Sequence, residues 1–161
     1  MVLIMEFYVD GGCRGNGRPN AVGAATVVRQ YRYREKSRTR QLDTYEYNAT
    51  SQRAEIFAII LALEWAMEAY QRSNTSPRIS VTIHTDSKYA VNCMNQWLDK
   101  WSNNGWINSA GGSVANQDIL LLAIQAENRV LDVGKVVYKW VPRDEVRDAD
   151  EKCREFLDDL Y

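Results

Sequence analysis

Two aspartates stand where apolar, strand-like segments end. Asp10 follows the run "FYV" and Asp86 follows "VTIHT", so each carboxylate closes a segment that is typical of a buried β-strand. Sites in open α/β sheets form where strands end, which makes both side chains candidates for metal binding or catalysis. Taken singly, each aspartate is equally well explained as a turn residue.

Two further carboxylates accompany segments with helical periodicity. We expect Glu55 in the first turn of a long helix and Asp150 near the start of the last helix. The helix dipole alone favours acidic residues at such positions. Each of these two, taken by itself, is therefore best interpreted as part of a helix cap.

The four carboxylates together support a different interpretation. Gathered at one end of a sheet, they would repel each other and raise one another's pKa values unless a cation neutralised them. Hard oxygen ligands without a Cys or His cluster indicate Mg²⁺, with Mn²⁺ as a substitute. Two such ions about 4 Å apart form a clamp for phosphoryl displacement, in which one activates the attacking water and the other stabilises the leaving oxygen.

The elements that position these residues follow a definite order along the chain. Strands are expected at residues 2–9, 21–28, 32–45, 79–85 and 135–141, and helices at residues 54–70, 87–100, 117–133 and 149–160. A Gly-, Asn- and Ser-rich loop is expected over residues 102–112. A hairpin meander followed by alternating helices and strands predicts an α/β fold with a five-stranded mixed sheet flanked by helices.

Length and composition favour one domain over the whole of residues 1–161. The chain has 161 residues and is 45% hydrophobic, which suffices for a sizeable core. No apolar run approaches a membrane span, and "MVLIMEF" lacks the basic leader of a signal peptide. Cys13, Cys93 and Cys153 are far apart and odd in number, so we expect a reducing compartment, cytoplasm or nucleus.

Charge is nearly balanced overall but unevenly distributed. The net charge is −1, whereas residues 29–40 hold six basic side chains against Glu35 alone. A basic stripe on one face can bind phosphates even in a neutral protein, and a solvated hairpin explains the pattern equally well. Residues 101–116 contain no Lys or Arg.

Four short blocks carry a family resemblance. In order, "YVDGGCRGNG", "TSQRAE", "TDSKY" and "RDADEKC" resemble the metal-site blocks of type 1 ribonuclease H, and "WLDKWSNNGW" resembles that family's Trp-rich segment. The resemblance covers the chain from Phe7 to about Phe156. It implies a ribonuclease H-like fold and endonucleolytic hydrolysis of the RNA strand of RNA–DNA hybrids. It also implies that two Mg²⁺ ions are held by Asp10, Glu55, Asp86 and Asp150.

The same resemblance implies a set of contacts to the hybrid duplex. The glycines after Asp10 allow a nucleic-acid backbone to approach, and Tyr89 and Trp101 match an aromatic channel that packs on deoxyribose. Ser51 stands where the family usually has Asn, which replaces an amide with a hydroxyl at a 2′-OH contact. Trp97 and Trp106 are assigned to packing. The implied nucleic-acid-binding residues are Gly11, Asn16, Thr50, Ser51, Gln52, Tyr89, Trp101, Ser109 and Asn116.

Departures from the family pattern lower the expected rate. The connection "VPRDEVRDAD" lacks the glycine-rich loop with a histidine that many members carry, and Arg147 stands in place of a glutamate. The only histidine, His84, is expected to be a strand residue. General acid–base assistance contributes ~10²- to 10⁴-fold, so we expect retained but slower hydrolysis.

Several alternatives stay open from the sequence alone. The chain could be the ribonuclease H domain of a reverse transcriptase, a catalytically weak hybrid-binding module, or a DNA-acting nuclease of the same fold. The four intact carboxylates argue against a pure binding module, because binding a polyanion does not call for them. We expect a monomer without a separate hybrid-binding domain and without a membrane partner.

Overall fold

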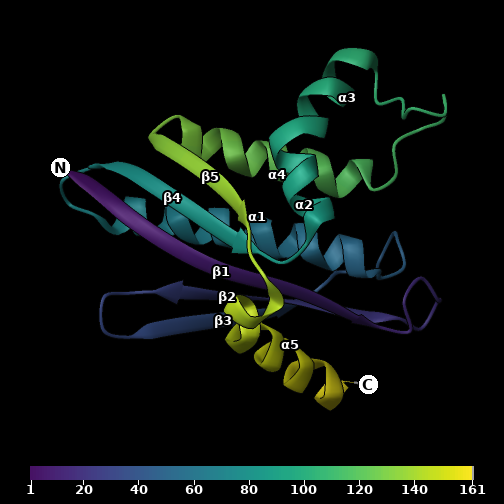
Figure 1. Cartoon of the computed structure of the whole chain (residues 1–161), viewed down its shortest axis with the longest axis horizontal. Helices are drawn as coiled ribbons and strands as arrows, with labels where there is room; N and C mark the ends of the chain where they lie inside the picture. Colours follow the sequence, from purple (N-terminus) through teal and green to yellow (C-terminus); the bar gives the residue numbers. More distant parts are fainter. Residues whose placement is uncertain (161) are drawn as a thin grey trace.

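A five-stranded mixed sheet forms the centre of the molecule. The computed structural model describes residues 1–160. The strands lie in the order β3-β2-β1-β4-β5 (Figure 1). Their bounds are β1 Val2–Arg14, β2 Val22–Gln30, β3 Glu35–Gln41, β4 Arg78–Thr85 and β5 Gly134–Trp140. The β1–β2 and β2–β3 pairs are antiparallel and the β1–β4 and β4–β5 pairs are parallel, which confirms the expected mixed sheet.

Helices cover both faces of this sheet. The long helix α1 (Ser51–Arg72) packs on β1 and β2 and against α4 (Gln117–Leu131), whereas α5 (Arg147–Leu160) packs on β1 and β2 from the other face (Figure 1). A shorter helical arm follows β4. It consists of α2 (Lys88–Asn92), the π-turn η1 (Cys93–Trp97) and α3 (Leu98–Asn104). A 3₁₀ turn, η2 (Arg143–Val146), leads from β5 into α5.

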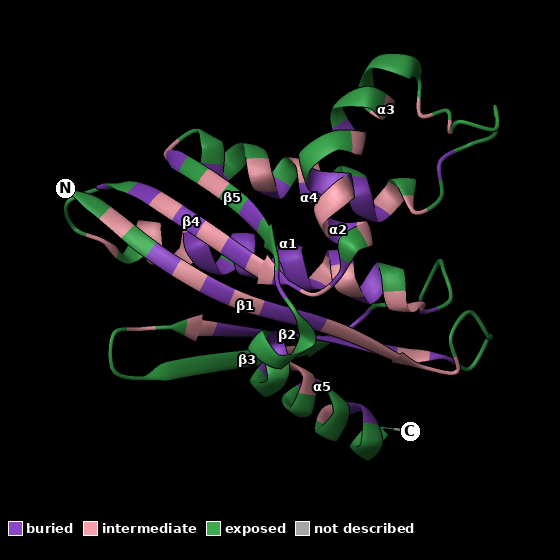
Figure 2. Ribbon diagram, viewed as in Figure 1, coloured by how far each residue is buried: buried purple, intermediate pink, exposed green. Residues whose placement is uncertain are grey.

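Alternation along β1 decides which side chains enter the core. Met5, Phe7 and Val9 are buried on the α1 side, and burying each such side chain contributes about 1.5–3 kcal/mol. A separate small cluster of Ala24, Cys153 and Leu157 joins β2 to α5. The buried segments therefore concentrate in the central strands and α1, while α5, β3 and the loop between β2 and β3 expose most of their surface (Figure 2).

Several expected boundaries are wrong. The third strand ends at Gln41 rather than continuing to residue 45, and α3 continues to Asn104, so the Gly- and Asn-rich loop begins later than residue 102. The expected helix over residues 87–100 is interrupted by the π-turn, in which hydrogen bonds span five residues. Such a turn leaves no simple composition signal.

All three cysteines lie within residues 1–160 and are free thiols, and Cys93 and Cys153 are buried. No helix of the described chain has the length and apolar character needed to cross a bilayer.

Candidate active site

Asp10 and Asp86 are brought together by the parallel pairing of β1 with β4. Val9 of β1 lies opposite Thr85, the last residue of β4, so Asp10 and Asp86 occupy neighbouring positions where this pairing ends. The expectation that Asp10 ends its strand is wrong, because β1 continues to Arg14 beside β2. Asp10 is only 8% exposed. Asp86 lies just past the end of β4, where Trp140 Nε1 donates a hydrogen bond to its backbone oxygen at 3.1 Å.

Glu55 reaches this place because β1 and α1 touch backbone to backbone. A Cβ added to Gly11 would lie 2.3 Å from the carbonyl carbon of Ala54, so only glycine permits this approach. Glu55 is the fifth residue of α1, and the first turn holds no acidic residue. The expected first-turn position is therefore wrong, and helix capping does not explain this carboxylate. Ser87 Oγ instead donates a hydrogen bond to Glu55 Oε2 at 2.7 Å.

Asp150 joins the other carboxylates from α5, on the far side of β1. It lies in the first turn of α5, as expected, and its side chain is 14% exposed. Arg154 Nη2 lies 3.0 Å from Asp150 Oδ2, one helical turn away. All four carboxylates line one open cavity of about 420 Å³.

The electrostatics of this cavity show an excess of negative charge. Burial, the charge of Asp86 and a hydrogen bond with Asp150 raise the pKa of Asp10 to about 8, although Arg143 acts in the opposite direction. Burial also raises the pKa of Glu55, and its hydrogen bond from Ser87 partly offsets this effect. The nearby arginines therefore do not neutralise the cluster.

A divalent cation fits this donor set. The four carboxylates supply hard oxygen ligands, and the high pKa of Asp10 shows that positive charge at this point would be favourable. Within residues 1–160, no three Asp, Glu, His or Cys side chains already surround a single point as a closed ion site. The four carboxylates share the wall of the cavity without converging on one point.

Most of the polar residues implied in nucleic-acid binding lie together at the start of α1. Asn16 Oδ1 accepts a hydrogen bond from the Ser51 backbone N–H at 2.8 Å, and Thr50 caps α1 by accepting from Arg53 N–H. Asn116 Nδ2 lies 3.4 Å from Gln52 Oε1. We call this group the polar ledge; it comprises Asn16, Thr50, Ser51, Gln52 and Asn116.

The role of Asn116 differs from a simple helix cap. It precedes α4 with φ 65°, and its side chain makes no capping hydrogen bond. Its amide donates instead to the Tyr89 hydroxyl at 3.0 Å. Asn116 therefore links the polar ledge, at the start of α4, to Tyr89 of α2.

Aromatic rings continue from Tyr89 along the helical arm. Ring centroids are separated by 6.2 Å for Tyr89–Trp97, 5.6 Å for Trp97–Trp101 and 6.2 Å for Trp101–Trp106. The packing role expected for Trp97 and Trp106 is consistent with these contacts. Ser109 lies in the exposed loop after α3, and no contact in the described chain joins it to the polar ledge.

His84 does not line the carboxylate cavity. Its Nε2 lies 2.7 Å from Glu6 Oε2, and its ring stacks on Tyr8 with centroids 4.2 Å apart. Charged contributors to the cavity were missed from the sequence: Arg14, Arg143 and Arg154 line it. Ser87, which is outside this lining but hydrogen-bonds to Glu55, was missed as well. Only Arg154 carried a signal, since it lies four residues after Asp150 on a helix.

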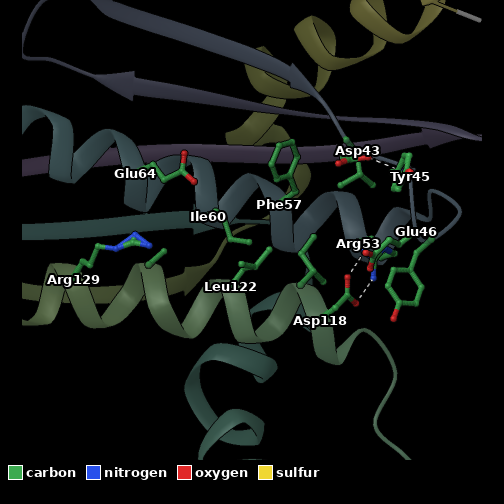
Figure 3. Close-up of a pocket in the computed structure, with 14 residues that line it drawn as sticks. Asp43, Tyr45, Glu46, Arg53, Phe57, Ile60, Glu64, Asp118, Leu122 and Arg129 are labelled. Atoms are coloured by element: carbon green, nitrogen blue, oxygen red, sulfur yellow. Dashed lines mark hydrogen bonds and ion pairs between the residues drawn. The ribbon is translucent and has the colours of Figure 1, made fainter.

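A second cavity, of about 310 Å³, lies between α1, α4 and the segment before α1 (Figure 3). Its wall contains Arg53, whose two terminal nitrogens each donate to Asp118 at 2.8 Å. None of the four carboxylates lines it. The chemistry expected from the sequence therefore belongs to the first cavity alone.

Comparison with known proteins assigns the family. The family model described as RNase H matches residues 4–145. The chain belongs to the ribonuclease H family. It is 32% identical over 160 residues to "Ribonuclease H" of Hydrogenovibrio crunogenus, with 97% of each protein covered. It is also 32% identical to "Ribonuclease HI" of Pasteurella multocida, over 85% of this chain and 76% of that one.

Solved ribonuclease H structures share the fold. LC9-RNase H1, described as a type 1 RNase H with the type 2 active-site motif, superposes with a TM-score of 0.73 at 23% identity, covering 96% of this chain and 72% of that one. LC11-RNase H1, solved in complex with an RNA/DNA hybrid, superposes with a TM-score of 0.62 at 21% identity and covers 94% of each chain. This ribonuclease H is thus an enzyme of a family that cleaves the RNA strand of RNA–DNA hybrids and generally uses divalent metal ions.

Proposed function

We propose that the chain hydrolyses the RNA strand of RNA–DNA hybrids endonucleolytically, with two Mg²⁺ ions held by Asp10, Glu55, Asp86 and Asp150. The observation that carries this proposal is the single cavity lined by all four carboxylates. Its unneutralised charge, which raises the pKa of Asp10 to about 8, supports a cation there. When bound, the ions would activate the attacking water and stabilise the leaving oxygen.

The side chains around the carboxylates orient and modulate them. Ser87 holds one oxygen of Glu55 and leaves the other free to bind a cation. Arg143 Nε lies 3.7 Å from Asp86 Oδ2 and is 69% exposed, so it can swing from the carboxylate to a phosphate of the RNA. These two residues supply part of the positioning that the absent histidine loop does not.

The polar ledge supports selectivity for the RNA strand. Ser51 lines the same cavity as the carboxylates, and Asn16 accepts a hydrogen bond from the Ser51 backbone N–H. Neighbouring donors and acceptors of this kind can hydrogen-bond consecutive 2′-hydroxyls, which DNA lacks. Tyr89 and Trp101 present aromatic rings for the deoxyribose of the DNA strand. The complex of LC11-RNase H1 with an RNA/DNA hybrid supports a hybrid as the partner here.

An alternative is a catalytically weak hybrid-binding module. Arg143 and Arg154 each contact a cavity carboxylate, and a cation would have to compete with both of them. Retained hydrolysis at a reduced rate is our expectation, because a cation held by several carboxylates at once outweighs two partly exposed arginine contacts.

The test is cleavage of end-labelled RNA in a hybrid, with Mg²⁺, Mn²⁺ or EDTA. Double-stranded RNA and double-stranded DNA serve as substrate controls. Asp10→Asn removes a charge from the cavity, and Asp159→Asn, at an exposed acid on α5, removes a charge elsewhere. We expect metal-dependent cleavage of hybrid RNA alone, abolished by Asp10→Asn and unaffected by Asp159→Asn. Hybrid binding without cleavage by either ion would favour the binding module instead.

A further inference from the structure

The loop that joins β2 to β3 combines basic and aromatic side chains. Residues 29–36, here called the hairpin tip, read "RQYRYREK" and hold four basic residues against one acid. The tip lies at the end of the sheet that also carries the N-terminus (Figure 1). It shares no lining residue with the carboxylate cavity. The carboxylate mechanism therefore leaves it without a role.

The tip is held in shape by its own hydrogen bonds. Tyr31 N–H donates to the Arg34 carbonyl at 2.8 Å and closes the loop. The Gln30 side-chain amide donates to the Tyr31 carbonyl at 3.0 Å and to the Arg34 carbonyl at 3.3 Å. A loop pinned in this way presents its side chains at a smaller entropic cost on binding than a mobile one.

Arginine and tyrosine alternate around the tip as stacked pairs. The guanidinium carbons of Arg29 and Arg34 lie 4.5 Å and 5.1 Å from the ring centroid of Tyr31. Arg32 lies 5.2 Å from the ring of Tyr33, which is 87% exposed. An exposed ring beside a guanidinium offers a face on which a nucleic-acid base can stack.

The charge of the tip is free for a partner. Farther along β3, Arg38 and Arg40 form ion pairs with Glu68 and Glu64 of α1. Within residues 1–160, the tip's basic side chains form no ion pair; these are Arg29, Arg32, Arg34 and Lys36. Glu64 and Glu68 of α1 thus neutralise Arg38 and Arg40, whereas the hairpin tip keeps its positive charge.

We propose that the hairpin tip is a second nucleic-acid contact, which binds single-stranded RNA or DNA that continues from the hybrid. Tyr33 stacks on a base, and Arg32 and Arg34 bind the phosphates beside it. The aromatic ring favours nucleic acid over an acidic protein or membrane, since those offer charge without bases. The part of this proposal that places the single strand on an RNA–DNA hybrid rests on the proposed function.

The spacing along the sheet sets the length of strand required. Asp10 lies opposite Thr26 and Phe7 opposite Arg29, so the tip begins three residues, or about 10 Å, along β2 from Asp10. At about 3.4 Å per nucleotide, this distance corresponds to roughly three nucleotides. Hybrids with a single-stranded extension of about ten nucleotides should engage the tip, whereas short blunt hybrids should not.

Binding is measured first, without cleavage. Fluorescence anisotropy with labelled oligo(dT) of about 20 nucleotides, in EDTA, is followed from about 50 to 200 mM salt. The slope of the logarithm of the binding constant against the logarithm of the salt concentration reports the phosphate contacts. We expect Arg32→Ala/Arg34→Ala to reduce the magnitude of this slope by about 1.4. We expect Tyr33→Ala to weaken binding at least about fivefold without changing the slope. The matched control Arg78→Ala/Arg129→Ala removes two exposed arginines elsewhere.

A cleavage assay with the same variants separates this proposal from the proposed function. The tip variants should cleave short blunt hybrids at the wild-type rate. They should lose the increase in cleavage rate that a single-stranded extension gives the wild type. If no variant cleaves but oligo(dT) binding depends on the tip, the second contact stands and the proposed hydrolysis fails. An equal loss of oligo(dT) binding in the control Arg78→Ala/Arg129→Ala would overturn the second contact. It would also be overturned if the tip were needed to bind vesicles with about 30% phosphatidylserine but not to bind oligo(dT).

Discussion

Replacing Asp10 by asparagine should stabilise the metal-free protein at alkaline pH. Burial and the neighbouring carboxylates raise the pKa of Asp10 from 3.8 to about 8, so the folded state holds the proton more tightly than the unfolded state. This contribution favours folding below about pH 4 and is lost progressively as the pH rises towards 8. Asparagine cannot ionise, so the stability of the variant does not fall with rising pH for this reason.

The size of the effect follows from the same pKa. Each pKa unit is worth about 1.36 kcal/mol, which gives an upper bound near 6 kcal/mol above pH 8. Asp10 interacts with two neighbouring carboxylates, so the value for an isolated site overstates the effect, and we expect the variant to be more stable by about 2–3 kcal/mol, or about 5–10 °C in melting temperature.

Thermal unfolding in EDTA at about pH 5 and about pH 9 measures the gain. The gain in stability of the Asp10→Asn variant should be small at about pH 5 and reach about 2–3 kcal/mol at about pH 9. The control Asp159→Asn should show no such dependence on pH. Adding Mg²⁺ should stabilise the wild type more than the Asp10→Asn variant. A gain that is the same at both pH values, or no gain at pH 9, would refute the electrostatic reasoning.

Two further changes test the packing that supports the site. Gly11→Ala should destabilise the fold by ~3 kcal/mol in urea unfolding, because the added Cβ would meet the backbone of Ala54. The control is Gly112→Ala, whose Cβ would meet no backbone atom and which should change stability little. Arg53→Met should cost ~2 kcal/mol, below the ~3–5 kcal/mol typical of a broken buried ion pair, because Asp118 is one-third exposed. The double variant with Asp118→Leu should recover most of that loss in the same assay; a double variant no more stable than the single one would contradict this account.

The two strand aspartates could be predicted because the apolar alternation before each of them marks a buried strand, and the order of elements then placed β1 and β4 in one sheet. Asp86 follows the last residue of β4, as expected, but Asp10 does not end its strand, because β1 continues to Arg14 paired with β2. Glu55 could be named but not explained from the sequence. Its position depends on the backbone contact of Gly11 with Ala54, whereas the sequence led us to explain that glycine only by the approach of a nucleic acid.

Other features depended on contacts that no local pattern records. The π-turn Cys93–Trp97 arises from a shift in backbone hydrogen bonding inside a segment that is helical throughout. The third strand ends at Gln41 because its pairing with β2 ends at Ala24, which its own weak alternation could not reveal. Arg143 reaches Asp86 only because β5 lies beside β4.

The division of charge on the molecule links the two sites. The cavity concentrates negative charge that repels a nucleic acid until a cation is bound, so affinity for the substrate must come from elsewhere on the surface. The loop after α3 supplies none, because residues 101–116 have no Lys or Arg. Among the described residues 1–160, the hairpin tip keeps four basic side chains without an ion pair, while Arg38 and Arg40 of the basic stripe pair with α1. A strand held at the tip would therefore offset the repulsion at the cavity, and binding should depend on the tip most strongly when metal is absent.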